Sequence, residues 1–231
     1  MTPKEKRMLI LGPLLQELED CGYFLGKGHL FSVNRSGRYC VAIHPELYSN
    51  GCIKLVHVSF GTFYRRLVLD KKYGVALGEA LMLSVMPGWS DCSNAQMVDD
   101  FCHVAADDLV NRIRNGILPY LRQIHDIASF VDAAECLEGF HPMATWQYER
   151  AWDYMALGYR ERAYQFLDSI IHHPLFEAEG LIPNHRLPAC QLLAELQMLD
   201  DAAVQVELEK RVALSERSCQ DYFGVRRWSK C

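Results

Sequence analysis

Hydrophobic residues near the N-terminus recur at helical spacing. The segment Thr2-Pro3-Lys4-Glu5 has the form of a capping box with proline at the first helical position. An apolar row with a spacing of three to four follows it: Met8, Leu11, Leu15 and Leu18. The pattern predicts an N-terminal helix, which Pro13 should kink or restart.

The period of the pattern changes to two after Tyr23. In residues 39–44 the larger apolar residues Tyr39, Val41 and Ile43 alternate with Cys40, Ala42 and His44, and residues 53–60 can be divided into two alternating sets in the same way. Turn-forming residues separate these segments at 34–37 and 49–51. Because strands joined by short turns leave no room for parallel crossovers, we predict an antiparallel meander from His29 to about Leu69.

The helical period returns from about Val75, and we expect only helices from there on. Two rows carry this period: Phe101, Ala105, Leu109, Ile113, and then Leu121, Ile124, Ala128, Val131. Ser129 to Asp132 has the form of a second capping box. Residues 84–94 are rich in turn-formers and carry Trp89, so they form either a surface connection or an interaction loop, with Trp89 folded back on the core in the first case.

Apolar residues beyond Pro142 also follow the helical period. Three rows repeat the spacing i, i+3, i+4, i+7: Tyr148, Ala151, Trp152, Met155; Ala163, Phe166, Leu167, Ile170; and Ala189, Leu192, Leu193, Leu196. The predicted fold is therefore α+β, with an N-terminal helix and an antiparallel β-meander covered by helices, followed by C-terminal α-helical hairpins. We expect an α+β domain over residues 1–139 and a helical-hairpin region over 140–231 docked on it.

Composition narrows the class of protein. The chain has 231 residues, half of them hydrophobic, but no uninterrupted apolar run long enough for a membrane span and no recognisable signal peptide. Its nine cysteines are dispersed and form no CxxC pair, which favours free thiols in a reducing, cytoplasmic compartment. The net charge of -5 argues against a nucleic-acid-binding surface.

Two groups of residues could carry chemistry. Cys40 and His44 share one strand face, and His57 could lie on the neighbouring strand, so a cysteine nucleophile and a histidine base could meet there. Buried cysteine and sheet-bonded histidine explain the same residues without catalysis. The second group consists of His172, His173 and His185. With Glu177 or Glu179 it could bind a metal ion, or its adjacent histidines could cap the end of a helix.

Acidic residues gather on one predicted helix. Asp100, Asp107 and Asp108 fall near one side of it, next to Asp99, and Glu79 and Asp91 add negative charge in the flanking sequence. Three explanations are open. The group could be a solvated helix face whose charge is balanced by downstream arginines, or two of its carboxylates could act as acid and base in hydrolysis. In the third explanation, the group is a surface that attracts a basic partner. In the third case the partner-binding residues are Trp89, Asp91, Asp99, Asp100, Asp107 and Asp108.

Two resemblances accompany these patterns. The order of segments over about residues 8–139 resembles an uncharacterised bacterial family found among toxin-immunity proteins. These segments are a leucine-rich helix, then Gly22-Tyr23-Phe24, a meander whose last strand ends in SFGTFY, and a helix pair joined by Leu118-Pro119-Tyr120-Leu121. Residues 151–174 resemble one tetratricopeptide-like hairpin, with small or aromatic packing positions at Tyr154, Gly158, Ala163 and Leu167. The first resemblance implies an α+β protein that acts by binding, without catalytic residues.

Three functional classes remain open. The first is a cytoplasmic immunity-type protein that binds and neutralises a bacterial toxin, with a basic toxin domain as its partner. The second is a helical adaptor that holds a peptide or protein through its C-terminal hairpins, and the third is an enzyme of unrecognised type. We expect a protein partner, no enzymatic activity, no cofactor, no metal, no nucleic acid and no membrane, while the oligomeric state is left open.

Overall fold

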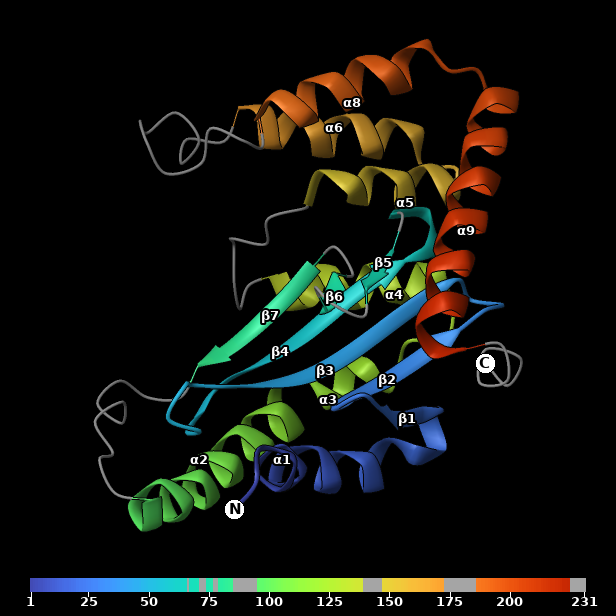
Figure 1. The fold of residues 1–231 in the computed structure, drawn as a ribbon. Helices are drawn as coiled ribbons and strands as arrows, with labels where there is room; N and C mark the ends of the chain where they lie inside the picture. Colours follow the sequence, from blue (N-terminus) through green and yellow to red (C-terminus); the bar gives the residue numbers. More distant parts are fainter. Residues whose placement is uncertain are drawn as a thin grey trace. The chain divides into compact units, whose positions relative to one another are not determined.

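The computed structural model describes residues 1–65, 67–70, 74–76, 79–84, 95–138, 147–172 and 186–224 (Figure 1). The chain forms two compact units. One comprises Met1–Phe60 and Ala80–Pro142, and the other comprises Gly61–Glu79 and Met143–Lys230. The predicted boundary between residues 139 and 140 falls outside the described residues and stays a prediction. The architecture is α+β, as the sequence predicts.

The N-terminal helix α1 spans Pro3–Leu18 and begins at the predicted capping box. The Glu5 backbone N–H donates to the Thr2 hydroxyl at 3.3 Å, and the Thr2 N–H donates to the Glu5 carboxylate at 2.6 Å. The helix continues through Pro13 without a restart. Its buried face consists of Lys6, Ile10, Leu11, Leu14 and Leu18. Of the predicted row, Leu11 and Leu18 are fully buried, whereas Met8 and Leu15 are half-buried at the margin of this face. The helix carries apolar residues on several sides, so periodicity alone does not select the most buried one.

The sheet of the first unit has five strands in the order β1-β2-β3-β4-β7. Its strands are β1 Tyr23–Gly26, β2 His29–Asn34, β3 Tyr39–Leu47, β4 Ile53–Thr62 and β7 Glu79–Ser84. β2 pairs antiparallel with β1 and with β3, and Leu30 lies opposite Ile43. β3 and β4 are sheet neighbours joined by a short turn, which makes that pair antiparallel as well. The predicted meander is therefore confirmed through β4.

Two strands lie outside the predicted limits of the sheet. β1 precedes His29 and reaches β2 through Lys27-Gly28, which both have positive φ (48° and 79°), as two-residue hairpin turns require. The expectation of helices only after Val75 is wrong, because β6 (Gly74–Ala76) and β7 are strands. The Ala-Leu-Met-Leu sequence of β7 fits a helix as well as a strand, and pairing with β4 decides between them.

Three helices complete the first unit: α2 Ala95–Gly116, α3 Leu118–Leu121 and α4 Ile127–Glu138. The predicted α2 row of Phe101, Ala105, Leu109 and Ile113 is buried, which confirms the helical period there. The Phe130 ring of α4 lies 5.9 Å from the Tyr39 ring of β3 and 6.3 Å from the Phe60 ring of β4, measured between centroids. Helix α4 therefore covers the sheet face that carries Tyr39 and Phe60.

Helix α4 begins at Ile127, two residues before the predicted capping box, and Asp126 caps it. The Ser129 backbone N–H donates to the Asp126 carboxylate at 2.8 Å, and the Asp126 backbone N–H donates to the Ser129 hydroxyl at 3.1 Å. Ser129 therefore closes the box from inside the helix rather than opening one with Asp132. In the usual capping box, a serine or threonine caps the helix and a glutamate three residues later bonds back to it. Here an aspartate caps the helix and a serine three residues later bonds back, so a search for Ser/Thr-x-x-Asp/Glu does not find it.

The second unit consists of a small hairpin and four α-helices among its described residues. The hairpin pairs β5 (Val68–Asp70) with β6, directly after the short 3₁₀ helix η2 (Phe63–Arg65). A further 3₁₀ turn, η3 (Gln147–Arg150), leads into α5 Ala151–Ala156, α6 Arg160–Ile171, α8 Arg186–Met198 and α9 Asp201–Phe223. Helix α6 packs between α5 and α8, while α9 packs against η2 and β5 (Figure 1). The predicted C-terminal helical hairpins are confirmed.

None of the helices within the described ranges has the length and apolar character needed to cross a membrane.

Candidate protein-binding surface

Helix α2 presents two large apolar side chains to solvent. Met97 is 56% exposed and Val104 is 60% exposed, and their spacing of seven positions corresponds to about two helical turns, which places both on the same side. The opposite side of α2 carries the buried row that packs into the first unit. The helix is therefore held by one face, and the other is free to present its side chains.

Carboxylates surround Val104 on this exposed side. Asp100 precedes Val104 by four residues, and Asp107 and Asp108 follow it by three and four, so all three are its neighbours on the helix surface. All three are exposed. Arg112 lies 3.5 Å from Asp108 and offsets part of the negative charge. We call this group, Met97, Asp100, Val104, Asp107 and Asp108, the α2 surface.

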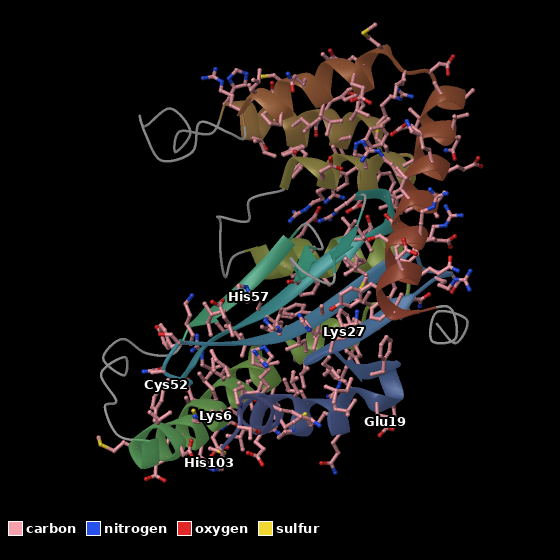
Figure 2. All side chains as sticks on the ribbon, in the orientation of Figure 1. Lys6, Glu19, Lys27, Cys52, His57 and His103 are labelled. Atoms are coloured by element: carbon pink, nitrogen blue, oxygen red, sulfur yellow. The ribbon has the colours of Figure 1, made fainter. Side chains whose placement is uncertain are left out.

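Asp99 has a different role from its neighbours. Its carboxylate accepts from the Lys6 ammonium at 3.0 Å and from the Met1 amine at 2.5 Å. These hydrogen bonds lower the pKa of Asp99 from its ordinary value, the Met1 amine contributing most. Lys6, labelled in Figure 2, is almost fully buried on α1. Asp99 therefore joins α2 to α1 and is less available to a partner than the sequence suggests.

Two residues of the predicted binding group cannot be placed. Trp89 and Asp91 fall outside the residues that the structure describes, and their part in binding stays a prediction. The sequence did not predict that Met97 and Val104 of α2 belong to the surface. A valine or a methionine in a helix gives no sign of exposure until the buried side of that helix is known.

The histidines of the sheet form a row across three strands. His29 of β2 and His44 of β3 stack with ring centroids 4.0 Å apart, and the His44 ring centroid lies 6.2 Å from that of His57 of β4. The sequence argument brought His44 and His57 together but missed His29. Extending the Leu30–Ile43 pairing by one residue places His29 opposite His44, so the register of the hairpin was the missing signal.

Cys40 and His57, which could have formed a nucleophile and base with His44, have other contacts in the structure. Cys40 is fully buried on β3, and its thiol lies 4.0 Å from the Val41 carbonyl oxygen. His57 instead pairs through Nε2 with Glu46 at 3.0 Å, and Lys54 donates to the other oxygen of Glu46 at 2.8 Å. These two contacts lower the pKa of Glu46, Lys54 contributing most.

The remaining metal candidates are described only in part. His172 follows α6, and its Nε2 lies 3.4 Å from Asp168 one turn earlier, an arrangement that suits a helix end. His173, His185, Glu177 and Glu179 fall outside the described residues. In the part of the chain that the structure describes, no three metal-ligating side chains gather in one place.

A network of buried charges occupies the second unit, and sequence patterns gave no indication of it. Asp153 of α5 accepts from Thr62 and forms an ion pair with Arg65, and neither ionic side chain has any exposed surface. Arg211 of α9 lies 2.8 Å from Glu149 and 3.1 Å from Glu207, with its guanidinium 3.9 Å from the centre of the Trp152 ring. The network joins the segment after β4 to α5 and α9.

No protein-family model, no curated protein and no solved structure matches this chain.

Proposed function

We propose that this protein acts by binding a basic protein partner through the α2 surface. The observation that supports this proposal is the position of Val104, which is 60% exposed at the centre of three aspartates. An exposed apolar side chain gives an interface a site that can be desolvated, and the surrounding carboxylates attract opposite charge.

The chemistry of the α2 surface defines its partner. Lysine or arginine side chains should approach Asp100, Asp107 and Asp108, around an apolar patch that receives Val104 and Met97. Like charges near one another on a helix destabilise the free protein slightly, and a basic partner relieves that repulsion. The charges should mainly accelerate association, and Val104 should mainly slow dissociation.

The immunity-type role is the finer part of this proposal. Proteins of that class neutralise a toxin by covering it in a tight complex, and the order of helix, meander and helices resembles a family found among them. The matching partner is then the product of an adjacent gene with a basic C-terminal domain. Neutralisation requires only the binding surface and needs no chemistry from this chain.

The experiment measures binding kinetics with the purified product of the adjacent gene. Val104→Lys should abolish the complex or weaken it by about two orders of magnitude, since it places a positive charge where the partner is basic. Replacing Asp100, Asp107 and Asp108 together by Asn should slow association most strongly at low salt. Circular dichroism should show that both variants keep the fold, because these residues are exposed.

Matched control variants come from the second unit. Val206 on α9 is 66% exposed, and Val206→Lys makes the same chemical change on another helix. Asp221, also exposed on α9, provides the charge control as Asp221→Asn. Binding that is lost with Val104→Lys and kept with Val206→Lys supports the α2 surface. The reverse result would transfer the interface to the C-terminal helices and favour the adaptor reading.

A further inference from the structure

The histidine row is held together by ring stacking rather than by hydrogen bonds between its members. The rings of His29 and His44 lie 17° from parallel, and His29 also stacks on Phe31 with centroids 5.3 Å apart. His44 and His57 keep the same 17° angle at the longer distance. Three rings from three adjacent strands thus form one continuous stack across the sheet.

The close stacking of His29 on His44 favours neutral rings at these two positions. His29 is 9% exposed, and its Nδ1 lies 3.0 Å from the Lys27 carbonyl oxygen, to which a neutral ring can donate. The Nδ1 atom of His44 is buried and has no hydrogen-bond partner of good geometry. Two charged rings at 4.0 Å would repel one another in a poorly solvated place.

The charged groups around the row reinforce this preference. Arg7 of α1 brings a positive charge to His29 and His44, and its side chain reaches the Lys27-Gly28 turn. From β4 come His57 and Lys54, and from β3 comes Glu46, which is already bound to both of them. The Glu46 carboxylate therefore binds His57 rather than the two stacked rings.

Burial and these charges act in the same direction on both rings. The pKa of His44 is lowered to about 4, mainly by burial and also by the charges of His29, His57 and Arg7. A hydrogen bond with the Gly28 backbone opposes this lowering slightly. Burial also lowers the pKa of His29. The two residues join β3 to β2, whose other neighbour, β1, is the edge strand of the sheet.

We propose that the stacked pair of His29 and His44 is an acid-sensitive latch that keeps the β1–β2 hairpin paired with β3 near neutral pH and releases it when these two rings take up protons. The latch is separate from the α2 surface and does not depend on the proposed function. It is a device for sensing a fall in pH.

The direction of the effect follows from the protonation of His44 in the two forms. Above its ordinary value of 6.5 the ring is neutral in the closed and open forms, and pH does not favour either. Between 6.5 and about 4 only the solvated ring of the open hairpin takes a proton, so acid favours opening. His44 alone would raise the opening equilibrium constant about 30-fold between about pH 7.5 and pH 5.

Hydrogen exchange of the hairpin, residues 23–34, tests the proposal on the full chain, with rates corrected for the intrinsic effect of pH. Wild-type protein should lose protection in this hairpin on acidification before it loses protection in α2. His44→Phe, which keeps a stacked ring that cannot be charged, should remove most of that loss. His103→Gln, an exposed histidine on α2, should leave it unchanged.

Two results would overturn the latch. One is the same acid-dependent opening in His44→Phe as in wild type, and the other is hairpin protection that does not change with pH in the wild-type protein. If His44→Phe does not fold, the proposal is tested on the wild-type protein by following the NMR shift of the His44 ring protons as a function of pH. A midpoint near 4 supports the proposal, whereas a midpoint near 6.5 rejects it.

Discussion

Asp153 and Arg65 form an ion pair from which solvent is fully excluded on both sides. The Arg65 Nε–H donates to the Asp153 carboxylate at 2.6 Å, and the Thr62 hydroxyl donates to the other carboxylate oxygen. Because three hydrogen-bonding groups from two distant segments converge, the pair fixes the segment after β4 against helix α5. Replacing Asp153 would remove a carboxylate that binds a buried arginine.

Asp153→Asn should therefore destabilise the protein by about 3–5 kcal/mol in urea denaturation. Asp201→Asn is the matched control, since Asp201 also pairs with an arginine, Arg160 at 2.7 Å, but its side chain is 98% exposed. That change should cost about 1 kcal/mol or less. Equal losses in the two variants would show that burial does not set the strength of the Asp153 pair.

Ser215 joins α9 to the segment after β4 by two hydrogen bonds. Its hydroxyl donates to the Phe63 carbonyl at 2.8 Å and accepts from the Leu67 N–H at 2.9 Å, and the side chain is fully buried. Ser215→Ala removes both of these buried hydrogen bonds and should cost about 1–3 kcal/mol. Ser218→Ala removes a single partly buried bond to the Leu69 N–H and should cost about 0.5–1.5 kcal/mol. Urea denaturation of both variants measures these losses. A lower midpoint for Ser218→Ala than for Ser215→Ala would contradict the prediction.

Asp126 caps helix α4, and its contribution should depend on pH. Hydrogen bonds from the Ser129 backbone and side chain, the backbone first, lower the pKa of Asp126 below its ordinary value of 3.8. The charged form is thus favoured in the folded protein, and its stabilisation is present above pH 3.8 and lost as the pH falls through the lowered value.

Asp126→Ala should therefore cost about 0.5–2 kcal/mol near neutral pH, and the difference from wild type should shrink in acid. Thermal unfolding across a pH series measures it. Asp126→Asn keeps the cap but not the charge, so it should lose little stability and show no such titration. A constant difference between Asp126→Ala and wild type down to the acid limit would exclude the charge as the cause.

The described cysteines are free thiols: Cys21, Cys40, Cys52, Cys102, Cys136, Cys190 and Cys219. Adding reductant should accordingly leave the melting temperature unchanged. A fall of several degrees in calorimetry would mean that a disulfide contributes to stability.

Local patterns were sufficient wherever neighbours in the chain decide the structure. The Thr2–Glu5 capping box, the turns of the meander and the buried row of α2 depend on residues a few positions apart, and each was predicted. Strand β7 was missed because its composition allows two structures. Part of the α1 face was misassigned because that helix is apolar on several sides.

The candidate site divides in the same way. The sequence placed Asp100, Asp107 and Asp108 on one helical side, since helix geometry fixes their spacing. It did not show that Val104 is exposed among them, because exposure depends on which side of α2 the rest of the fold covers.

The sequence by itself determined the α+β class, the meander and the helical period of the C-terminal part, all of which follow from short-range spacing. Only the tertiary structure decided that His29 stacks on His44, that Asp153 meets Arg65 and that Asp99 is bound to Lys6. These partners are 15, 88 and 93 positions apart in the chain. Their meeting depends on strand register and helix packing, which arise when the whole chain excludes water from its core.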